Sequence, residues 1–128
     1  MSLRLLLTLA GGLEILAGSA ALIIPAPVVL FLLGASMDPI ASVLARLFGA
    51  GVFALGLASL KARRDVGSPS GVAVSIGITA YNVLAAAVLL LTAAGSDLGG
   101  LLLWGAGIGH AVLSALFASA LFKRPTHV

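Results

Sequence analysis

The residues best suited to chemistry in this chain are Glu14, Arg46, Asn82 and His110, because each carries a strongly polar group inside a different long apolar stretch. A charged side chain at the centre of a bilayer costs about 2.5–3.5 kcal/mol on insertion scales, so such residues usually face the protein interior or a wet cavity. We therefore expect these four side chains to face one another, and together they form the candidate site.

Two interpretations of a converging cluster stay open, beside the alternative that the four residues do not converge. In the structural one, Glu14 and Arg46 form a membrane-buried ion pair, and hydrogen bonds from Asn82 and His110 fix which helix meets which. In the functional one, the same groups line a small wet pocket that binds a proton, a lipid head group, a quinone or another small polar ligand.

Small residues lie within about one helical turn of each polar group: Ala10, Gly11, Ala17 and Gly18 around Glu14, Gly49 and Ala50 after Arg46, Ala85 and Ala86 after Asn82, and Ala106, Gly107 and Ser114 around His110. Residues three and four apart share a helix face, and small residues mark tight helix–helix contact in membranes. Each polar group is therefore predicted on or near a face that meets another helix. Gly105 and Gly109 form a GxxxG pair, for which we predict the same kind of contact.

Three further residues are accessory candidates. Tyr81 stands beside Asn82 and needs a hydrogen-bond partner for its hydroxyl if it is buried. Ser114 stands one turn after His110. Trp104 lies near one end of its apolar stretch, where an interfacial aromatic belt would place it.

Catalytic and metal-binding templates fail. Ser114, His110 and Glu14 have the residue types of a triad, but the chain contains no GxSxG nucleophile elbow, no HExxH and no Walker loop. It has no cysteine, and its two histidines, His110 and His127, are far apart in sequence. We predict that the protein is not an enzyme and has no metal or other cofactor.

Composition indicates that lipid is the main solvent around this chain. The chain is 61% hydrophobic and 9% charged, with mean hydropathy +1.24, whereas soluble domains carry about 25% charged residues. A soluble protein of 128 residues could not bury so much apolar surface. The pI near 10.2 comes from seven Lys and Arg residues, most of them clustered at the ends of apolar stretches, so we exclude nucleic acid as a partner.

Four membrane spans must then position the polar groups, at about residues 3–24, 40–60, 70–92 and 98–122. A helix of about 20 apolar residues crosses the hydrocarbon core of a bilayer. Prolines separate the stretches, and the apolar segment between Pro25 and Met37 is too short to cross, so we expect an interfacial or re-entrant segment. The predicted fold is an all-α, four-helix membrane bundle with a single domain, 1–128.

Basic residues predict the orientation of these spans. They flank the start of the first span, the second connection between spans and the end of the fourth span: Arg4, then Lys61, Arg63 and Arg64, then Lys123 and Arg124. The other two connections carry only Asp38 and Asp97. Since excess Lys and Arg marks the cytoplasmic side, both termini are predicted to be cytoplasmic, in a multi-pass protein of the cell (inner) membrane.

Two segments resemble a known family. The run 46–56, Arg-Leu-Phe-Gly-Ala-Gly-Val-Phe-Ala-Leu-Gly, is similar to the Arg-Leu…Gly…Phe…Gly run of DoxX-like four-span bacterial proteins. The segment 13–18, Leu-Glu-Ile-Leu-Ala-Gly, is similar to their Leu-Glu…Gly segment, and the two pieces occur in reversed order. This resemblance covers the first two spans and implies a small bacterial membrane protein, often an accessory subunit, without catalytic residues.

The chain also resembles the small multidrug resistance transporters, because it is near their length and has a glutamate in the first of four spans. In that family a first-helix carboxylate exchanges protons for cationic drugs, and only Glu14 matches here, because no lysine follows it in the first span. We predict a non-enzymatic accessory or lipid- or small-ligand-binding bundle. The alternative is a proton-coupled transporter that uses Glu14 and acts as a dimer. The predicted partners are membrane lipid, further copies of the chain or a larger membrane complex, and a small hydrophobic or polar ligand.

Overall fold

The computed structural model describes residues 1–123, which form five α-helices and no strand. The helices are α1 (Leu3–Ile23), α2 (Pro25–Leu33), α3 (Pro39–Ala62), α4 (Pro69–Gly95) and α5 (Leu103–Phe122). All except α2 are long and apolar enough to cross a membrane. The all-helical class and the four apolar spans are therefore confirmed, although the fourth span begins at Leu103 rather than near residue 98. His127 lies outside the described residues.

Helix boundaries follow from local capping chemistry. Ser2, Asp38 and Ser68 precede α1, α3 and α4, and each side chain accepts a hydrogen bond from a backbone N–H of the first turn. A proline occupies the first turn of α2, α3 and α4, where its missing N–H leaves no hydrogen bond unmade. Pro25, Pro39 and Pro69 thus begin helices.

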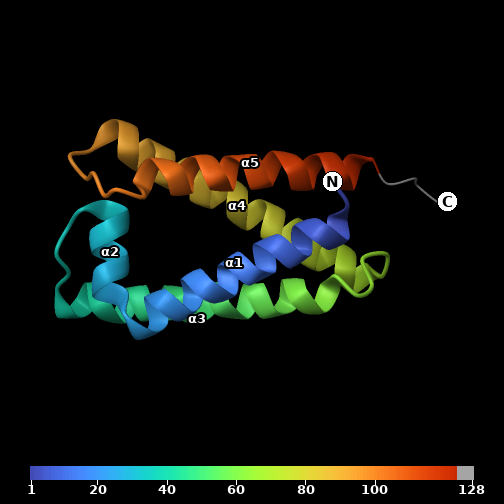
Figure 1. Cartoon of the computed structure of the whole chain (residues 1–128), viewed down its shortest axis with the longest axis horizontal. Coiled ribbons are helices and arrows are strands. Elements are labelled where there is room, and N and C mark those ends of the chain that lie inside the picture. Colours follow the sequence, from blue (N-terminus) through green and yellow to red (C-terminus); the bar gives the residue numbers. More distant parts are fainter. Residues whose placement is uncertain (124–128) are drawn as a thin grey trace.

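The four long helices form two pairs, α1 with α3 and α4 with α5. The two pairs lie at an angle to each other (Figure 1). Within the first pair the backbones touch at glycines. A Cβ atom added to Gly18 would lie 2.5 Å from the backbone nitrogen of Phe53, and one added to Gly49 would lie 2.8 Å from the Gly18 carbonyl oxygen. One added to Gly56 would lie 2.8 Å from the carbonyl oxygen of Gly11. Only glycine permits this approach.

The predicted contact through Gly105 and Gly109 is wrong within this chain. Both residues are exposed, and a Cβ at either would meet nothing within 4 Å. Gly107, on the other side of α5, is the buried glycine instead, and a Cβ there would lie 2.8 Å from a methyl carbon of Leu90. Which glycines of α5 are buried depends on the rotation of this helix about its own axis. A GxxxG pattern does not determine that rotation.

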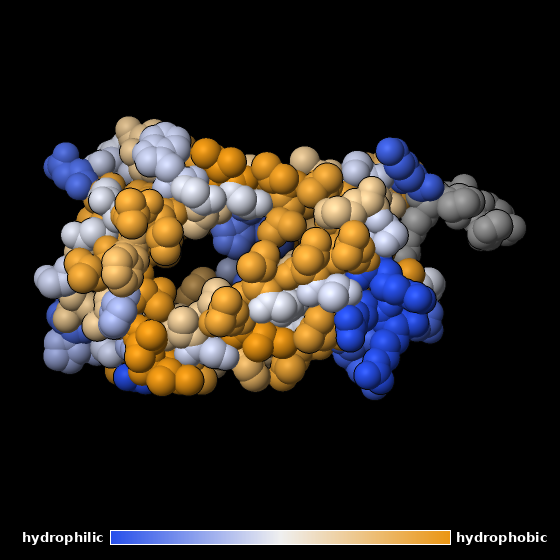
Figure 2. Space-filling view, viewed as in Figure 1, coloured by the Kyte–Doolittle hydropathy of each residue, from blue (hydrophilic) through white to orange (hydrophobic). Residues whose placement is uncertain are grey.

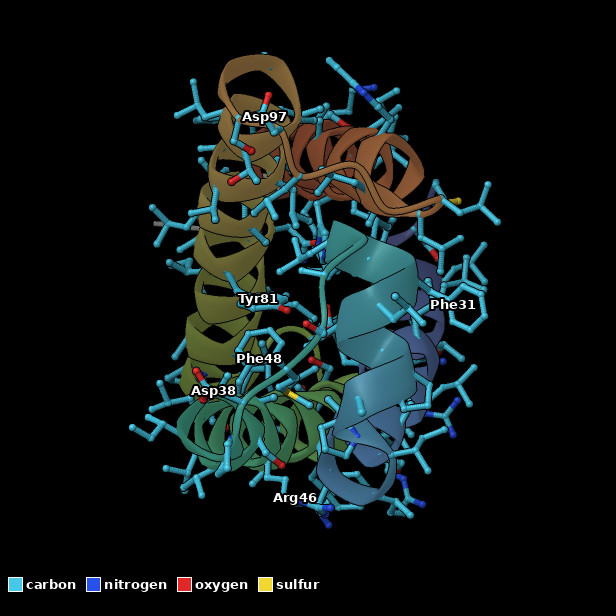
Figure 3. All side chains as sticks on the ribbon, turned by 90° about the vertical axis from the view of Figure 1, so that its left-hand side faces the viewer. Phe31, Asp38, Arg46, Phe48, Tyr81 and Asp97 are labelled. Atoms are coloured by element: carbon cyan, nitrogen blue, oxygen red, sulfur yellow. The ribbon has the colours of Figure 1, made fainter. Side chains whose placement is uncertain are left out.

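The two pairs meet at one end of the molecule, around an apolar core contributed by α1, α4 and α5. The buried members are Leu3, Leu6, Leu7, Ala10, Ile78 and Phe117. We call this the basic end, because Arg4, Lys61, Arg63, Arg64 and Lys123 cluster there, beside the start of α1, the end of α3 and the end of α5 (Figure 1). The opposite, acidic end carries Asp38 and Asp97 (Figure 3).

At the acidic end, α2 bridges the two pairs. It runs across the long axis from the end of α1 toward the connection between α4 and α5 (Figure 1). Backbone hydrogen bonds join it to that connection: Gly99 N–H donates to the Leu33 carbonyl at 3.1 Å, and Leu102 N–H donates to the Phe31 carbonyl at 3.0 Å. A Cβ at Gly100 would lie 2.2 Å from the Leu32 backbone, so glycine is required at this crossing. The segment expected between the first two spans is thus a short helix that closes one end of the molecule.

Candidate functional site

Glu14 lies near the middle of α1, one turn beyond the last core residue of that helix, Ala10. Its side chain is only 4% exposed. The glycine contacts of Gly11 and Gly18 hold this part of α1 against α3. The carboxyl group is therefore positioned by the glycine contact between α1 and α3.

Asn82 and His110 meet between α4 and α5. Asn82 is fully buried one turn beyond the core residue Ile78, and its Nδ2 donates to the Ile78 carbonyl at 2.8 Å. Its Oδ1 lies 2.7 Å from His110 Nδ1. Because an amide oxygen only accepts, Nδ1 carries the proton and donates. Nε2 of a neutral His110 is then a hydrogen-bond acceptor, and no residue in the range 1–123 pairs with it.

Tyr81 connects this pair to Glu14. Its ring packs edge-on against the His110 ring, with centroids 5.6 Å apart and an interplanar angle of 86°. Its phenol also lies within range of electrostatic interaction with the Glu14 carboxylate. Tyr81, Asn82 and His110 are thus in contact, and Glu14 of α1 is joined to them through its electrostatic interaction with Tyr81. We call these four residues from three helices the polar site.

The Glu14 carboxylate has no hydrogen-bond or ion-pair partner among residues 1–123. Every fully buried side-chain nitrogen or oxygen in that range has a partner. The unpaired carboxylate oxygens must therefore retain some accessible surface, although the residue as a whole is almost completely buried. The remaining surface of this carboxylate is therefore open to water or to a bound molecule.

Arg46 does not join the polar site, and the predicted ion pair with Glu14 is not formed in the described chain. Its side chain is exposed on the outer side of α3 (Figure 3), where Nη1 donates to the carbonyl of Leu22. Leu22 belongs to the last turn of α1, whose carbonyls lack helical partners. An arginine near a span end thus satisfies a helix C-terminus and avoids the cost of burial.

An opening separates the two helix pairs between the polar site and α2. The space-filling view shows it as a gap left of centre, with hydrophilic surface on the side away from α2 (Figure 2). Phe48 from α3 and Tyr81 from α4 both point into it (Figure 3). Phe48 is 59% exposed. We call this space the lateral opening, and it gives the polar site an approach walled mostly by apolar side chains.

The other accessory candidates lie apart from this chemistry. Ser114 Oγ donates to the His110 backbone carbonyl at 2.8 Å, a contact within its own helix, so it does not pair with the imidazole. Trp104 is 54% exposed in the first turn of α5, near the acidic end. Neither residue contributes a group to the polar site.

The polar site is therefore rich in hydrogen-bond acceptors. It offers a carboxylate, an imidazole nitrogen and a phenol, the last of which both donates and accepts. No group of three or more His, Cys, Asp or Glu side chains that could hold a metal occurs within residues 1–123. The arrangement is suited to holding a proton or the donating head of a ligand.

The small residues around Glu14 and Arg46 predicted helix–helix contact, but sequence reasoning missed two other features: the role of Phe48, and which two helices these glycines join. Phe48 belongs to the family-like run 46–56, and nothing in the sequence marks it as lining an opening. The glycine contacts had a usable signal, because Gly11 and Gly18 have the same seven-residue spacing as Gly49 and Gly56. In two antiparallel helices, equal spacing brings both glycine pairs into register.

No protein-family model, no curated protein and no solved structure matches this chain. The likenesses to DoxX-like proteins and to small multidrug resistance transporters therefore stay predictions, and the geometry of the polar site carries the functional argument.

Proposed function

We propose that this chain is a four-helix bundle of the bacterial inner membrane that binds a small amphiphilic ligand at the polar site and is not an enzyme. The observation that carries the proposal is the Glu14 carboxylate, which is 4% exposed in the middle of a span and has no partner within residues 1–123. An ionisable group is expensive inside a membrane and marks a functional site by default. The structural interpretation requires an ion pair between Glu14 and Arg46, but Arg46 contacts Leu22 instead.

The charge distribution supports an orientation with the basic end in the cytoplasm. Arginine and lysine residues gather at that end, whereas Asp38 and Asp97 are the charged residues of the two connections at the other. The positive-inside rule assigns the basic side to the cytoplasm. In this orientation, α2 lies across the outer ends of the spans, and the lateral opening faces the outer half of the bilayer.

The chemistry of the polar site favours a ligand whose head group donates hydrogen bonds or carries positive charge. Glu14 and the free nitrogen of a neutral His110 both accept hydrogen bonds, and the carboxylate carries negative charge when ionised. The exposed ring of Phe48 supplies an apolar wall for a tail. A primary amine on an alkyl chain satisfies both requirements, and an anionic head group satisfies neither.

The test is binding of radiolabelled dodecylammonium to the protein in lipid nanodiscs, with binding to empty nanodiscs subtracted. Dodecanol serves as the uncharged ligand of the same chain length. We expect the amine to bind more tightly than the alcohol, and Glu14→Gln to weaken amine binding about tenfold, the equivalent of about 1.4 kcal/mol. Arg46→Gln, a change of charge outside the polar site, should leave binding intact. Equal binding of amine and alcohol, or unaltered binding by Glu14→Gln, would overturn the proposal.

The unpaired state of Glu14 favours one second candidate, a proton-coupled transporter of the same class of ligand. A carboxylate without an internal partner lets a proton and a ligand cation compete for one site, which is the requirement for exchange. The transporter predicts proton release when dodecylammonium is added, loss of that release in Glu14→Gln, and amine movement into proteoliposomes driven by a pH gradient. Binding without movement would support the ligand-binding or accessory role.

A further inference from the structure

A second set of polar groups, with no carboxylate partner among residues 1–123, lies at the basic end, away from the polar site. An open pocket of about 340 Å³ is lined there by Arg4, Thr8, Arg63 and Arg64. Arg4 and Thr8 come from the first two turns of α1, and the two other arginines directly follow α3. The α1–α3 pair therefore brings three guanidinium groups to one pocket.

A hydrogen-bonded chain positions one of these arginines. Thr8 Oγ1 donates to the Arg4 carbonyl at 2.8 Å, and Arg63 Nη1 donates to Thr8 Oγ1 at 3.4 Å. Arg63 thus reaches from the end of α3 to α1. A guanidinium has five N–H donors, and this is the one side-chain hydrogen bond that Arg63 makes within residues 1–123. Its other side-chain donors make no hydrogen bond with residues 1–123.

No carboxylate neutralises the pocket in the described chain. Asp65 is the acidic residue next to it in sequence, but it forms no ion pair with Arg4, Arg63 or Arg64. One of its carboxylate oxygens lies 3.9 Å from the position a Cβ would take at Gly67. Three arginines that share a pocket without a counter-charge repel one another, and an anion bound among them removes this repulsion. Arginine matches the oxygens of a phosphate group in paired hydrogen bonds.

We propose that this pocket binds the phosphate group of an anionic phospholipid in the cytoplasmic leaflet. The neighbouring surface supplies room for an acyl chain. The helix face that carries Arg4 and Thr8 continues to Gly12, where a Cβ would meet nothing within 4 Å. On α3, Leu57 lies two turns before Arg64 and is 50% exposed. The space-filling view shows the hydrophilic patch of this end bordered directly by hydrophobic surface (Figure 2).

The lining residues of the pocket favour a lipid over a nucleotide. No aromatic side chain lines the pocket, so nothing there would stack on a nucleotide base. Basic residues at the cytoplasmic end of membrane helices also attract anionic lipids by general electrostatics. If the lipid binds in the pocket, its binding should depend on the pocket arginines. Binding should not depend on basic residues beside the pocket.

Lys61 provides the matched comparison, because it is an exposed basic residue near the end of α3 that does not line the pocket. Native mass spectrometry of the purified protein would measure binding of phosphatidic acid, of phosphatidylcholine and of soluble glycerol 3-phosphate. Phosphatidic acid should bind most tightly. Arg4→Gln, Arg63→Gln and Arg64→Gln should each weaken its binding about fivefold, as expected for the loss of one lipid-facing charge. Lys61→Gln removes the same charge and should change binding less than twofold.

Thermal unfolding of each variant shows that it is folded before its binding is compared. Equal weakening by Lys61→Gln and Arg64→Gln would overturn the pocket in favour of diffuse surface charge. Glycerol 3-phosphate bound as tightly as phosphatidic acid would overturn the lipid assignment, and phosphatidylcholine bound as tightly would overturn the anion assignment. Arg4→Gln lies on the other helix from Arg63 and Arg64, so its effect tests whether both helices build the site.

Discussion

The two halves of this molecule differ in how their helices meet. At the basic end, Leu6, Leu7, Ile78 and Phe117 are completely buried, and the two helix pairs are in contact. Toward the acidic end the pairs part, and Phe48 lies 59% exposed in the space between them. The polar site lies where the closed half ends. The closed half thus fixes the positions of polar groups that the open half makes accessible.

The most severe way to break this arrangement is to separate α1 from α3. In Gly18→Leu the new Cβ would lie 2.5 Å from the backbone nitrogen of Phe53. Backbone atoms cannot yield as a flexible side chain can, so we expect a loss of stability of about 3 kcal/mol, the upper end of typical overpacking effects. Thermal unfolding in detergent measures this loss.

Gly12→Leu is the control, because a Cβ at Gly12 would meet nothing within 4 Å. It should unfold at the temperature of the unmodified protein. Equal unfolding temperatures for the two leucine variants would contradict the glycine contact between α1 and α3.

The difference between the halves is tested directly by one phenylalanine from each. Phe117 is 0% exposed in the core at the basic end, so Phe117→Ala should leave a cavity and cost about 3 kcal/mol. Phe48→Ala should change stability by less than about 0.5 kcal/mol, since its ring is mostly exposed. Chemical unfolding of both variants gives the two values, and similar losses would mean that the opening is closed by packing.

Within the polar site, Asn82→Leu removes the hydrogen bond to His110. The Ile78 carbonyl and the His110 Nδ1–H both lose a partner, and we expect a loss of about 1 kcal/mol, in the range measured for interhelical hydrogen bonds in membranes. The ¹⁵N chemical shifts of His110 should also change, because its tautomer is no longer fixed. Unchanged shifts would show that Asn82 does not set the tautomer.

The smallest effect is expected for Glu14 and Arg46, which the structural interpretation of the sequence joins in an ion pair. Glu14→Gln and Arg46→Gln should change stability independently, with a coupling free energy below about 0.5 kcal/mol, because the two residues share no contact. A double-mutant cycle of unfolding free energies measures the coupling. A value of 2 kcal/mol or more, on the order expected for residues in direct contact, would restore the ion pair.

The sequence predicted the spans well and the polar site in part. Glu14, Asn82 and His110 each stand near the middle of an apolar stretch, and the cost of exposing polar groups to lipid turns all three inward. The prediction that Arg46 faces inward was wrong, because a long arginine side chain can find a partner away from the centre of the protein. Its length lets it reach the free carbonyls at the end of a neighbouring helix, close to the membrane surface.

The lateral opening could not be predicted, because it depends on the angle between two helix pairs. The glycine spacing in α1 and α3 specifies contact within one pair and says nothing about the other pair. The bridging by α2 depends on backbone hydrogen bonds to the 99–102 segment, which carry no side-chain signature beyond the glycine at position 100. The three-arginine pocket likewise needed the alignment of Arg4 with the end of α3.

The proposed ligand binding requires that Glu14, an unpaired carboxyl group within a membrane span, can be reached from the lateral opening. A hydrophobic carbodiimide, dicyclohexylcarbodiimide, reacts with carboxyl groups that it can reach through lipid, and peptide mass spectrometry locates the product. We predict that Glu14 is modified in the folded protein in nanodiscs, and that dodecylammonium slows the modification. An unmodified Glu14 in the folded protein, together with modification of the same peptide after unfolding, would contradict the account.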